Sequence, residues 1–313
     1  MTKLKLALTG IGKIAIDQHL PSIAGTGLFE LAGVVSQRGV TVPGVPTFHT
    51  QKELFAAVPG IEAVANCTPP HVRHGMAVEA LEAGKHLLIE KPPTASIAEL
   101  ADMAGIAARQ RRTLFATWHS RFNHGVDQAT KILLTRAIDS IAVTWKEDVR
   151  RWHPGQDWVF EAGGFGVFDP GINALSIITA ILPYPVFVTR SELSFPANRA
   201  TPIAADLTMR GPAGSGLKSM TCAFDWRQQG EQTWTIAVRF ADGGKLELTH
   251  GGTRLLVDGV ERVSEPDNEY RQIYRRFHKL ITAGQSDVDA SPLQIVADAF
   301  MMGRRRQVEG FEW

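Results

Sequence analysis

The chain has 313 residues, of which 44% are hydrophobic and 21% charged, so it is a globular protein large enough for two hydrophobic cores. Its 33 basic and 32 acidic residues leave a net charge of +1, which gives no reason to expect nucleic acid or an anionic membrane as a partner. No stretch approaches the roughly 20 apolar residues of a membrane helix. The two cysteines, Cys67 and Cys222, fit a reducing cytoplasm rather than a disulfide framework. We therefore expect a small-molecule partner.

The first 120 residues alternate short apolar runs of β type with helical runs, which is the pattern of a parallel sheet joined by crossover helices. The expected strands are 4–9, 29–35, 63–67, 86–90 and 113–118. The expected helices between them are 76–83 and 97–111.

After residue 119 the pattern changes. Apolar and polar residues alternate over 141–145, 234–240 and 246–248, which is typical of a half-exposed antiparallel sheet. The sequence therefore predicts an α/β protein with a domain boundary near residues 119–122. We expect the last amphipathic stretch, 292–308, to form a helix that can pack back on the first domain.

The first predicted strand runs into a glycine turn, Gly-Ile-Gly-Lys-Ile-Ala at residues 10–15. Gly10 permits the tight turn, and Gly12 lets a pyrophosphate approach backbone amides at the start of a helix. Such a motif is informative here because it begins a βαβ series. We expect a dinucleotide to contact Gly10, Gly12, Lys13 and Ile14.

The second predicted strand ends in Ser36-Gln37-Arg38, without the carboxylate that an NAD-selective site places there for the ribose hydroxyls. Ser36 can hydrogen-bond a 2′-phosphate, and Arg38 can pair with it or stack over the adenosine. We expect NADP to be accepted alongside NAD. The alternative is that both residues belong to a solvated loop.

Two further motifs carry polar groups suited to a hydroxyl substrate. Glu90-Lys91-Pro92 follows the fourth predicted strand, at the sheet edge where ligands of such folds bind, although Lys91 could also be a plain surface lysine. Asp169 and Asn173 are four residues apart behind the glycine-rich residues 163–166, so a helix opened by Pro170 would present both on one face. The alternative for Asp169 is a helix N-cap.

Several motifs together resemble the glucose-fructose oxidoreductase and inositol dehydrogenase (Gfo/Idh/MocA) family, over nearly the whole chain. They are the glycine turn 10–15, Cys-Thr-Pro-Pro-His at 67–71, Ala-Gly-Lys-His at 83–86, Glu-Lys-Pro at 90–92 and Gly-Val-Phe-Asp-Pro-Gly at 166–171. Within the family, residues 117–121, 145–156 continuing to Asn173, and 286–289 look like the D-galactose 1-dehydrogenase and L-arabinose 1-dehydrogenase branch.

The resemblance implies a Rossmann domain at 1–120 and a substrate-binding domain at 121–313 built on an open, mostly antiparallel sheet that can form a homodimer. It implies NAD(P)-dependent oxidation of D-galactose or L-arabinose at C1 to the lactone. It also adds cofactor-binding residues to those above. These are Thr68, Pro69, His71, Glu90 and Lys91.

The chemistry of that oxidation suggests a role for each polar group. We expect Asp169 to be the base, Lys91 to polarise the sugar hydroxyls and Asn173 to orient the reacting one. Many family members use a histidine four residues after the aspartate, but a neutral asparagine cannot accept a proton at neutral pH. The expected sugar-binding residues are Glu147, His153, His119 and Trp152. Each has an ordinary alternative. Glu147 could instead pair with Arg150 or Arg151, and Trp152 could belong to the core. A histidine such as His119 or His153 is often structural.

Two other functions remain open on the sequence. One is a non-catalytic NADP-binding regulator, because fold does not determine function. The other is an inositol or polyol dehydrogenase, whose mark would be a histidine in place of Asn173. No histidine and carboxylate cluster has metal-ligand spacing, so we expect no metal.

Overall fold

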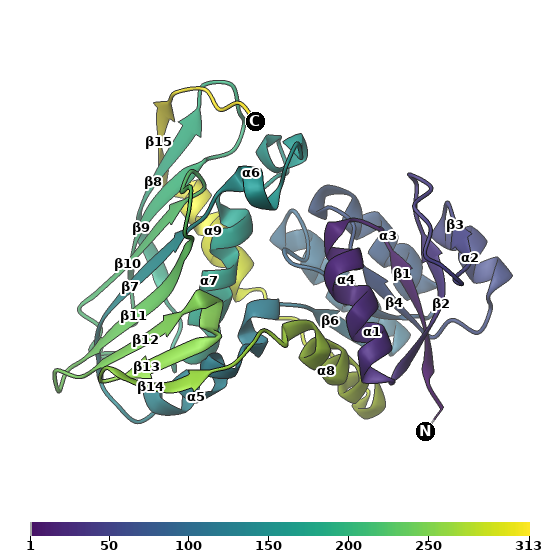
Figure 1. The fold of residues 1–313 in the computed structure, drawn as a ribbon, viewed down its shortest axis with the longest axis horizontal. Helices are drawn as coiled ribbons and strands as arrows, with labels where there is room; N and C mark the ends of the chain where they lie inside the picture. The colour runs from purple at the N-terminus through teal and green to yellow at the C-terminus, as the bar shows by residue number, and fades with distance from the viewer. Residues whose placement is uncertain (1) are drawn as a thin grey trace. The chain divides into compact units, whose positions relative to one another are not determined.

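The computed structural model describes residues 2–313, which form two compact units (Figure 1). The N-terminal unit contains the chain up to His119 together with Asn268–Ala290. The C-terminal unit contains Ser120–Asp267 and Ser291–Trp313. The chain therefore passes three times between the units.

Within residues 2–313, the sheet of the N-terminal unit has six strands in the order β3-β2-β1-β4-β5-β6, all parallel. This is the strand order of a Rossmann fold, and it confirms the predicted parallel sheet. The strands are β1 (Leu4–Thr9), β2 (Phe29–Val35), β3 (Thr47–Phe48), β4 (Ala63–Asn66), β5 (His86–Ile89) and β6 (Leu114–Ala116).

The central strands are mostly apolar because helices cover both faces of a parallel sheet. Leu8, Val64 and Leu88 are fully buried. The covering elements are the π-helical turn η1 (Ala15–His19), α1 (Leu20–Thr26), α2 (Gln51–Ala57), α3 (Pro70–Glu82), α4 (Ile97–Gln110) and α8 (Glu269–Ala283).

The sheet of the C-terminal unit has nine strands within residues 2–313, in the order β14-β13-β12-β11-β7-β10-β9-β8-β15. Only the β10–β7 and β15–β8 pairs among these strands are parallel, so the expected open and mostly antiparallel sheet is confirmed. The strands are β7 (Ile138–Lys146), β8 (Phe187–Pro196), β9 (Ala204–Arg210), β10 (Ser219–Asp225), β11 (Thr233–Phe240), β12 (Lys245–Thr249), β13 (Arg254–Val257), β14 (Val260–Ser264) and β15 (Gly303–Val308).

One face of this sheet packs against helices, and the strands alternate accordingly. In β9, Leu207 and Met209 are buried, whereas Thr208 and Arg210 are exposed. Figure 1 shows α7 and α9 running along the sheet. The helices of the unit are α5 (His124–Leu133), α6 (Val149–Trp152), α7 (Phe168–Ile181) and α9 (Ser291–Met301), with a 3-10 turn η3 (Asp157–Phe160).

The structure corrects the expectation for residues 292–308. The helix α9 ends at Met301, and Gly303–Val308 forms β15, which pairs with β8 at the sheet edge. A Cβ at Gly303 would lie 2.5 Å from Leu193 Cδ1 and 2.7 Å from Ala299 O, so the chain turns closely against its neighbours at this glycine. The segment that returns to the N-terminal unit is 268–290, which carries α8.

Candidate active site

The glycine turn after β1 has the geometry expected of a cofactor loop. Gly10 has φ +85°, and a Cβ there would lie 2.9 Å from the backbone nitrogen of Thr68. A Cβ at Gly12 would meet nothing within 4 Å, so the backbone there faces open space that a pyrophosphate could fill. Lys13 forms an exposed ion pair with Asp17, and Ile14 is exposed.

The loop after β2 places Ser36 and Arg38 differently. Ser36 is buried, and its Oγ accepts a hydrogen bond from the backbone nitrogen of Val40 at 3.0 Å. Arg38 is exposed at the turn. These positions leave both side chains at the end of β2, where the adenosine of a dinucleotide binds in folds of this order.

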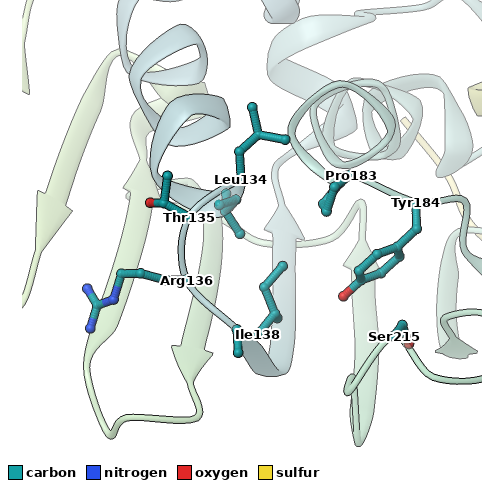
Figure 2. A pocket seen from close by; sticks show the side chains of 9 residues that line it. Leu134, Thr135, Arg136, Ile138, Pro183, Tyr184 and Ser215 are labelled. Carbon is teal, nitrogen blue, oxygen red and sulfur yellow. The ribbon is translucent and has the colours of Figure 1, made fainter.

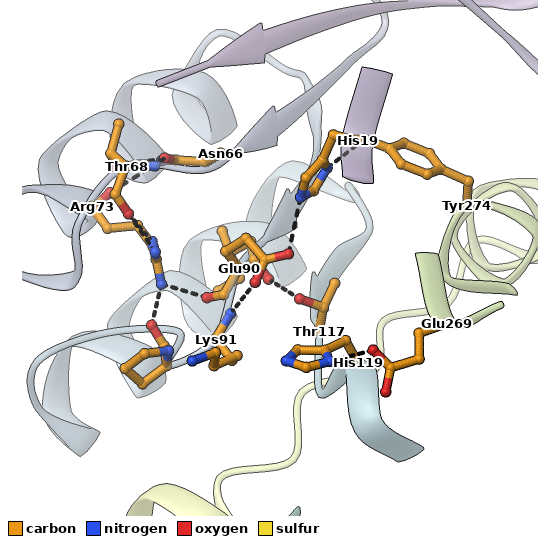
Figure 3. Close-up of polar contacts among 12 residues, drawn as sticks. His19, Asn66, Thr68, Arg73, Glu90, Lys91, Thr117, His119, Glu269 and Tyr274 are labelled. Carbon is orange, nitrogen blue, oxygen red and sulfur yellow. Dashed lines mark hydrogen bonds and ion pairs between the residues drawn. The ribbon is translucent and has the colours of Figure 1, made fainter. Parts of the chain in front are cut away.

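Arg73 on α3 joins the loops that follow β4 and β5 (Figure 3). This guanidinium is buried, and its Nε donates to the backbone oxygen of Thr68 at 2.9 Å. It also donates to the backbone oxygens of Glu90 and Pro92. The predicted cofactor residues Thr68 and Glu90 are thus brought together by an arginine that no sequence pattern singled out, while His71 is exposed on the first turn of α3.

The side chain of Glu90 fixes the backbone of Lys91. Glu90 is 3% exposed, and its Oε2 accepts a hydrogen bond from the Lys91 backbone nitrogen at 2.9 Å. Its Oε1 lies 3.0 Å from His19 Nε2, and His19 Nδ1 lies 2.7 Å from the Tyr274 hydroxyl. Figure 3 shows this chain of contacts from α8 through His19 to Lys91. Lys91 therefore extends from a loop that buried polar groups hold in place.

The charges of this network are set by burial and by neighbouring groups. Burial by itself raises the pKa of Glu90, but the hydrogen bond and charge of His19, with the charges of His119 and Arg73, lower that pKa to about 2. Burial lowers the pKa of His19, but Cys67, Tyr274 and Glu90 outweigh it and raise the pKa well above its ordinary value. The Glu90 carboxylate is consequently ionised at neutral pH and hydrogen-bonded to His19.

His119 follows β6 and is held by α8. Its Nδ1 lies 2.6 Å from Glu269 Oε2, and its ring stacks on Tyr270 with centroids 5.7 Å apart. Burial lowers the pKa of His119, but the carboxylates of Glu269 and Glu90 outweigh it and raise the pKa. Glu269, Tyr270 and Tyr274 were not sequence candidates, because nothing in an amphipathic helix shows which surface it covers.

Asp169 lies in the first turn of α7, in the C-terminal unit. The helix begins at Phe168 with Val167 as its N-cap, so Asp169 is not the N-cap that the alternative interpretation proposed. Asp169 is 4% exposed, and its Oδ2 lies 3.1 Å from His153 Nε2. A carboxylate in the first helical turn is also stabilised by the helix dipole.

The glycines before α7 allow the chain to approach its neighbours closely. Gly166 has φ +53°, and a Cβ there would lie 2.3 Å from the Pro202 oxygen. A Cβ at Gly164 would lie 2.4 Å from the Trp158 oxygen. A side chain at Gly164 would push the chain before α7 away from η3, and one at Gly166 would push it away from Pro202. The glycine-rich run therefore serves to seat Asp169 beside the segment that carries His153.

Asn173 lies one turn after Asp169 on α7 and is partly exposed. The spacing of four residues places both side chains on one face of the helix, as the sequence predicted. The Asn173 backbone oxygen accepts from Ser176 Oγ at 2.7 Å.

Glu147 is bound by two indoles. Its Oε1 accepts from Trp226 Nε1 at 3.1 Å, and its Oε2 accepts from Trp234 Nε1 at 2.9 Å. The Trp152 ring lies 5.7 Å from that of Trp234, and the His153 ring lies 5.4 Å from that of Trp226. The predicted sugar-binding residues Glu147, Trp152 and His153 thus share one aromatic cluster. The two tryptophans that bind Glu147 lie far along the chain and were not predicted.

A cavity of about 300 Å³ in the C-terminal unit contains none of the predicted site residues (Figure 2). It is lined by Leu133, Leu134, Thr135, Arg136, Ala137, Ile138, Pro183, Tyr184 and Ser215. Across residues 2–313, no helix is long and apolar enough to cross a membrane. No group of three or more histidine, cysteine, aspartate or glutamate side chains in that range is placed to hold a metal ion.

Comparison with known proteins adds three findings. Residues 4–117 match the model of an oxidoreductase family with an NAD-binding Rossmann fold. Galactose 1-dehydrogenase from Pseudomonas fluorescens is 42% identical over 311 residues, which cover 99% of each chain. The crystal structure of D-galactose-1-dehydrogenase from Rhizobium etli is similar with a TM-score of 0.94 and 50% identity, covering 100% of this chain and 99% of that one.

More distant structures share the fold alone. KijD10, a 3-ketoreductase from Actinomadura kijaniata solved with NADP and TDP-benzene, has a TM-score of 0.83 at 16% identity, covering 98% of this chain and 100% of that one.

Proposed function

The chain belongs to the Gfo/Idh/MocA family of oxidoreductases, and from that premise we propose that it is an NAD(P)-dependent aldose 1-dehydrogenase. Its substrates are D-galactose and L-arabinose, each oxidised at C1 to the aldonolactone. The observation that carries the proposal is the buried Asp169 carboxylate held 3.1 Å from His153 at the start of α7. The similarity to two galactose 1-dehydrogenases along the whole chain supports the choice of sugar.

Oxidation of the ring hemiacetal removes the proton of the C1 hydroxyl while a hydride leaves C1. The nicotinamide supplies the acceptor for that hydride when the cofactor is bound. Asp169 accepts the hydroxyl proton, and Asn173 orients the hydroxyl with one donor and one acceptor. Lys91 stabilises the negative charge that develops on oxygen. Asn173 is excluded as the base because a neutral amide has no basic site at neutral pH.

Both sugars are proposed because they share the configuration from C1 to C4 and differ by the hydroxymethyl group at C5. Glu147, His153, His119 and Trp152 are proposed to contact the sugar. Attraction for one extra carbon in an apolar pocket is worth only about 1–3 kcal/mol, so a pocket that recognises the shared hydroxyls accepts both sugars unless it blocks the extra group.

The test of the function is a substrate panel. Purified protein is mixed with D-galactose, L-arabinose, D-glucose and myo-inositol in the presence of NADP or NAD, and reduced nicotinamide is followed by its absorbance. We expect reduction with galactose and arabinose. Reduction with myo-inositol alone would make the protein a polyol dehydrogenase, and no reduction with any of them would favour the non-catalytic regulator.

For the cofactor, we propose that NADP is accepted alongside NAD, since Ser36 and Arg38 stand at the end of β2. Arg38→Ala is expected to lower the ratio of kcat/KM for NADP to kcat/KM for NAD about tenfold, because it removes a charge-assisted bond to the 2′-phosphate. The neighbouring Gln37→Ala is the control and should leave the ratio unchanged. An unchanged ratio in Arg38→Ala would remove Arg38 from the cofactor site.

We also propose a homodimer formed through the exposed face of the nine-stranded sheet, where β9 presents Asp206, Thr208 and Arg210. Sedimentation equilibrium measures this oligomeric state.

A cytoplasmic location is proposed because Cys67 and Cys222 are both unpaired thiols.

A further inference from the structure

His153 is carried by residues 149–160, here called the recognition segment. The segment consists of α6, a turn and η3, and so contains only two four-residue helical pieces. Short helices of this kind are not stable alone and depend on tertiary contacts. What packs against the segment therefore decides how firmly His153 is held at Asp169.

Residues 309–313, here called the C-terminal tail, follow β15 and pack on this segment. Phe311 is 5% exposed. Its ring centroid lies 5.0 Å from that of Phe160, and the Arg150 guanidinium lies over it at 4.4 Å. Asn198 holds the Phe311 backbone from both sides, since Phe311 N donates to Asn198 Oδ1 at 2.9 Å and Asn198 Nδ2 donates to Phe311 O at 3.1 Å.

Trp313 makes a second attachment on the other side of His153. Its Nε1 donates to Asp157 Oδ1 at 2.7 Å, an oxygen that also accepts from Arg199 at 2.8 Å. The Trp313 ring lies 5.9 Å from the ring of Phe160. Arg150 in turn donates to the Glu312 backbone oxygen at 2.5 Å. The tail thus contacts the recognition segment both before and after His153.

The tail is also connected to His153 through the aromatic cluster. The Phe160 ring packs on the Trp226 ring at 5.5 Å, and Trp226 contacts the His153 ring at 5.4 Å. Trp226 is fully buried and donates to Glu147. A shift of Phe160 after loss of Phe311 would therefore displace the side chains of His153 and Glu147 together. Close-packed interiors transmit such shifts because they contain few voids.

We propose that Phe311 and Trp313 are positioning residues that hold the recognition segment so that His153 stays in contact with Asp169. The proposal rests on the proposed function, because it assigns these residues to sugar recognition in the same site. It requires neither residue to touch the sugar. A tail that only covered apolar surface would contribute to stability and leave sugar kinetics unchanged.

The test compares the wild type with Phe311→Ala/Trp313→Ala and with Trp313→Phe. The double variant is expected to raise KM for D-galactose about tenfold or more and to lower kcat/KM about 10- to 100-fold, since small misplacements of a binding group cost this much. KM for NADP should change by less than about twofold. Trp313→Phe retains Phe311 and an aromatic ring at position 313 but removes the N–H donor. Its KM for D-galactose should therefore lie closer to the wild-type value than to that of the double variant. Met301→Ala, 87% exposed on α9, is the control.

Hydrogen–deuterium exchange gives a readout that needs no activity. Backbone amides of residues 149–160 should exchange faster in the double variant than in the wild type, while those of β1 and β4 should not. Unchanged exchange over 149–160 overturns the proposal. Faster exchange with an unchanged KM for galactose also overturns it, because the tail would then support only the fold. A wild type that oxidises neither sugar overturns the proposed function, and exchange still decides whether the tail holds the segment.

Discussion

Replacement of Asp169 by asparagine is expected to lower kcat for D-galactose by about two to four powers of ten, which is the usual worth of a general base. Asparagine has nearly the same shape, and its oxygen can still accept a bond from His153, which stands 3.1 Å away in the wild type. The change therefore removes the basic group with little change in packing. The measurement is steady-state turnover with saturating cofactor, alongside NADPH binding by fluorescence, which should be unchanged.

Asp127→Asn, exposed on α5, is the matched control and should turn over as the wild type does. Should Asp169→Asn keep most of its turnover, the proton is taken by Lys91 or another group. A large loss of NADPH binding would instead point to a disturbed fold.

Glu90→Gln is expected to lower the free energy of unfolding at neutral pH by about 3 kcal/mol. The Glu90 pKa is lowered from 4.5 to about 2, and each tenfold change in proton affinity is worth about 1.4 kcal/mol. The carboxylate therefore stabilises the folded state fully above pH 4.5, and this contribution is lost as the pH falls toward 2. Urea unfolding at a series of pH values measures the difference between variant and wild type.

The difference in the free energy of unfolding between variant and wild type should shrink as the pH falls. The wild type then loses the ionised Glu90 carboxylate, which the variant already lacks. Glu82→Gln, at an exposed position near the end of α3, is the control and should follow the wild type at every pH. The His19 pKa is raised, so its own contribution is present below pH 6.5 and is lost as the pH rises through the folded-state value. A constant difference between variant and wild type from neutral pH down to about 3 would contradict an ionised Glu90 carboxylate hydrogen-bonded to His19.

The parallel sheet of the N-terminal unit could be predicted from the sequence with good boundaries. The strands β1 and β2 begin and end at the predicted residues. A parallel sheet is buried on both faces, so its strands are continuous apolar runs that stand out locally. The turn at Gly10 was also predictable from a local signal, because a tight strand-to-helix turn requires a residue without a side chain.

The edge of the second sheet could not be predicted in this way. The strand β15 contains Arg304, Arg305 and Arg306, and β8 and β9 also lay outside the predicted strands. Charged residues are common on edge strands, which pair through their backbones whatever their side chains are. No helix was predicted over 269–283, so both α8 and its packing on the first unit were missed. Even a recognised amphipathic helix shows that one face is buried but not against what.

For the candidate site, the sequence by itself determined the residue types and the local spacings: Lys91 after β5, and Asp169 and Asn173 on one helix face. Only the tertiary structure decided their partners. His153 stands at Asp169, Glu147 is held by two tryptophans, and Glu90 joins His19 to the backbone of Lys91. Helical spacing follows from backbone geometry within a few residues, whereas these contacts join residues far apart in the chain and depend on how strands and helices pack.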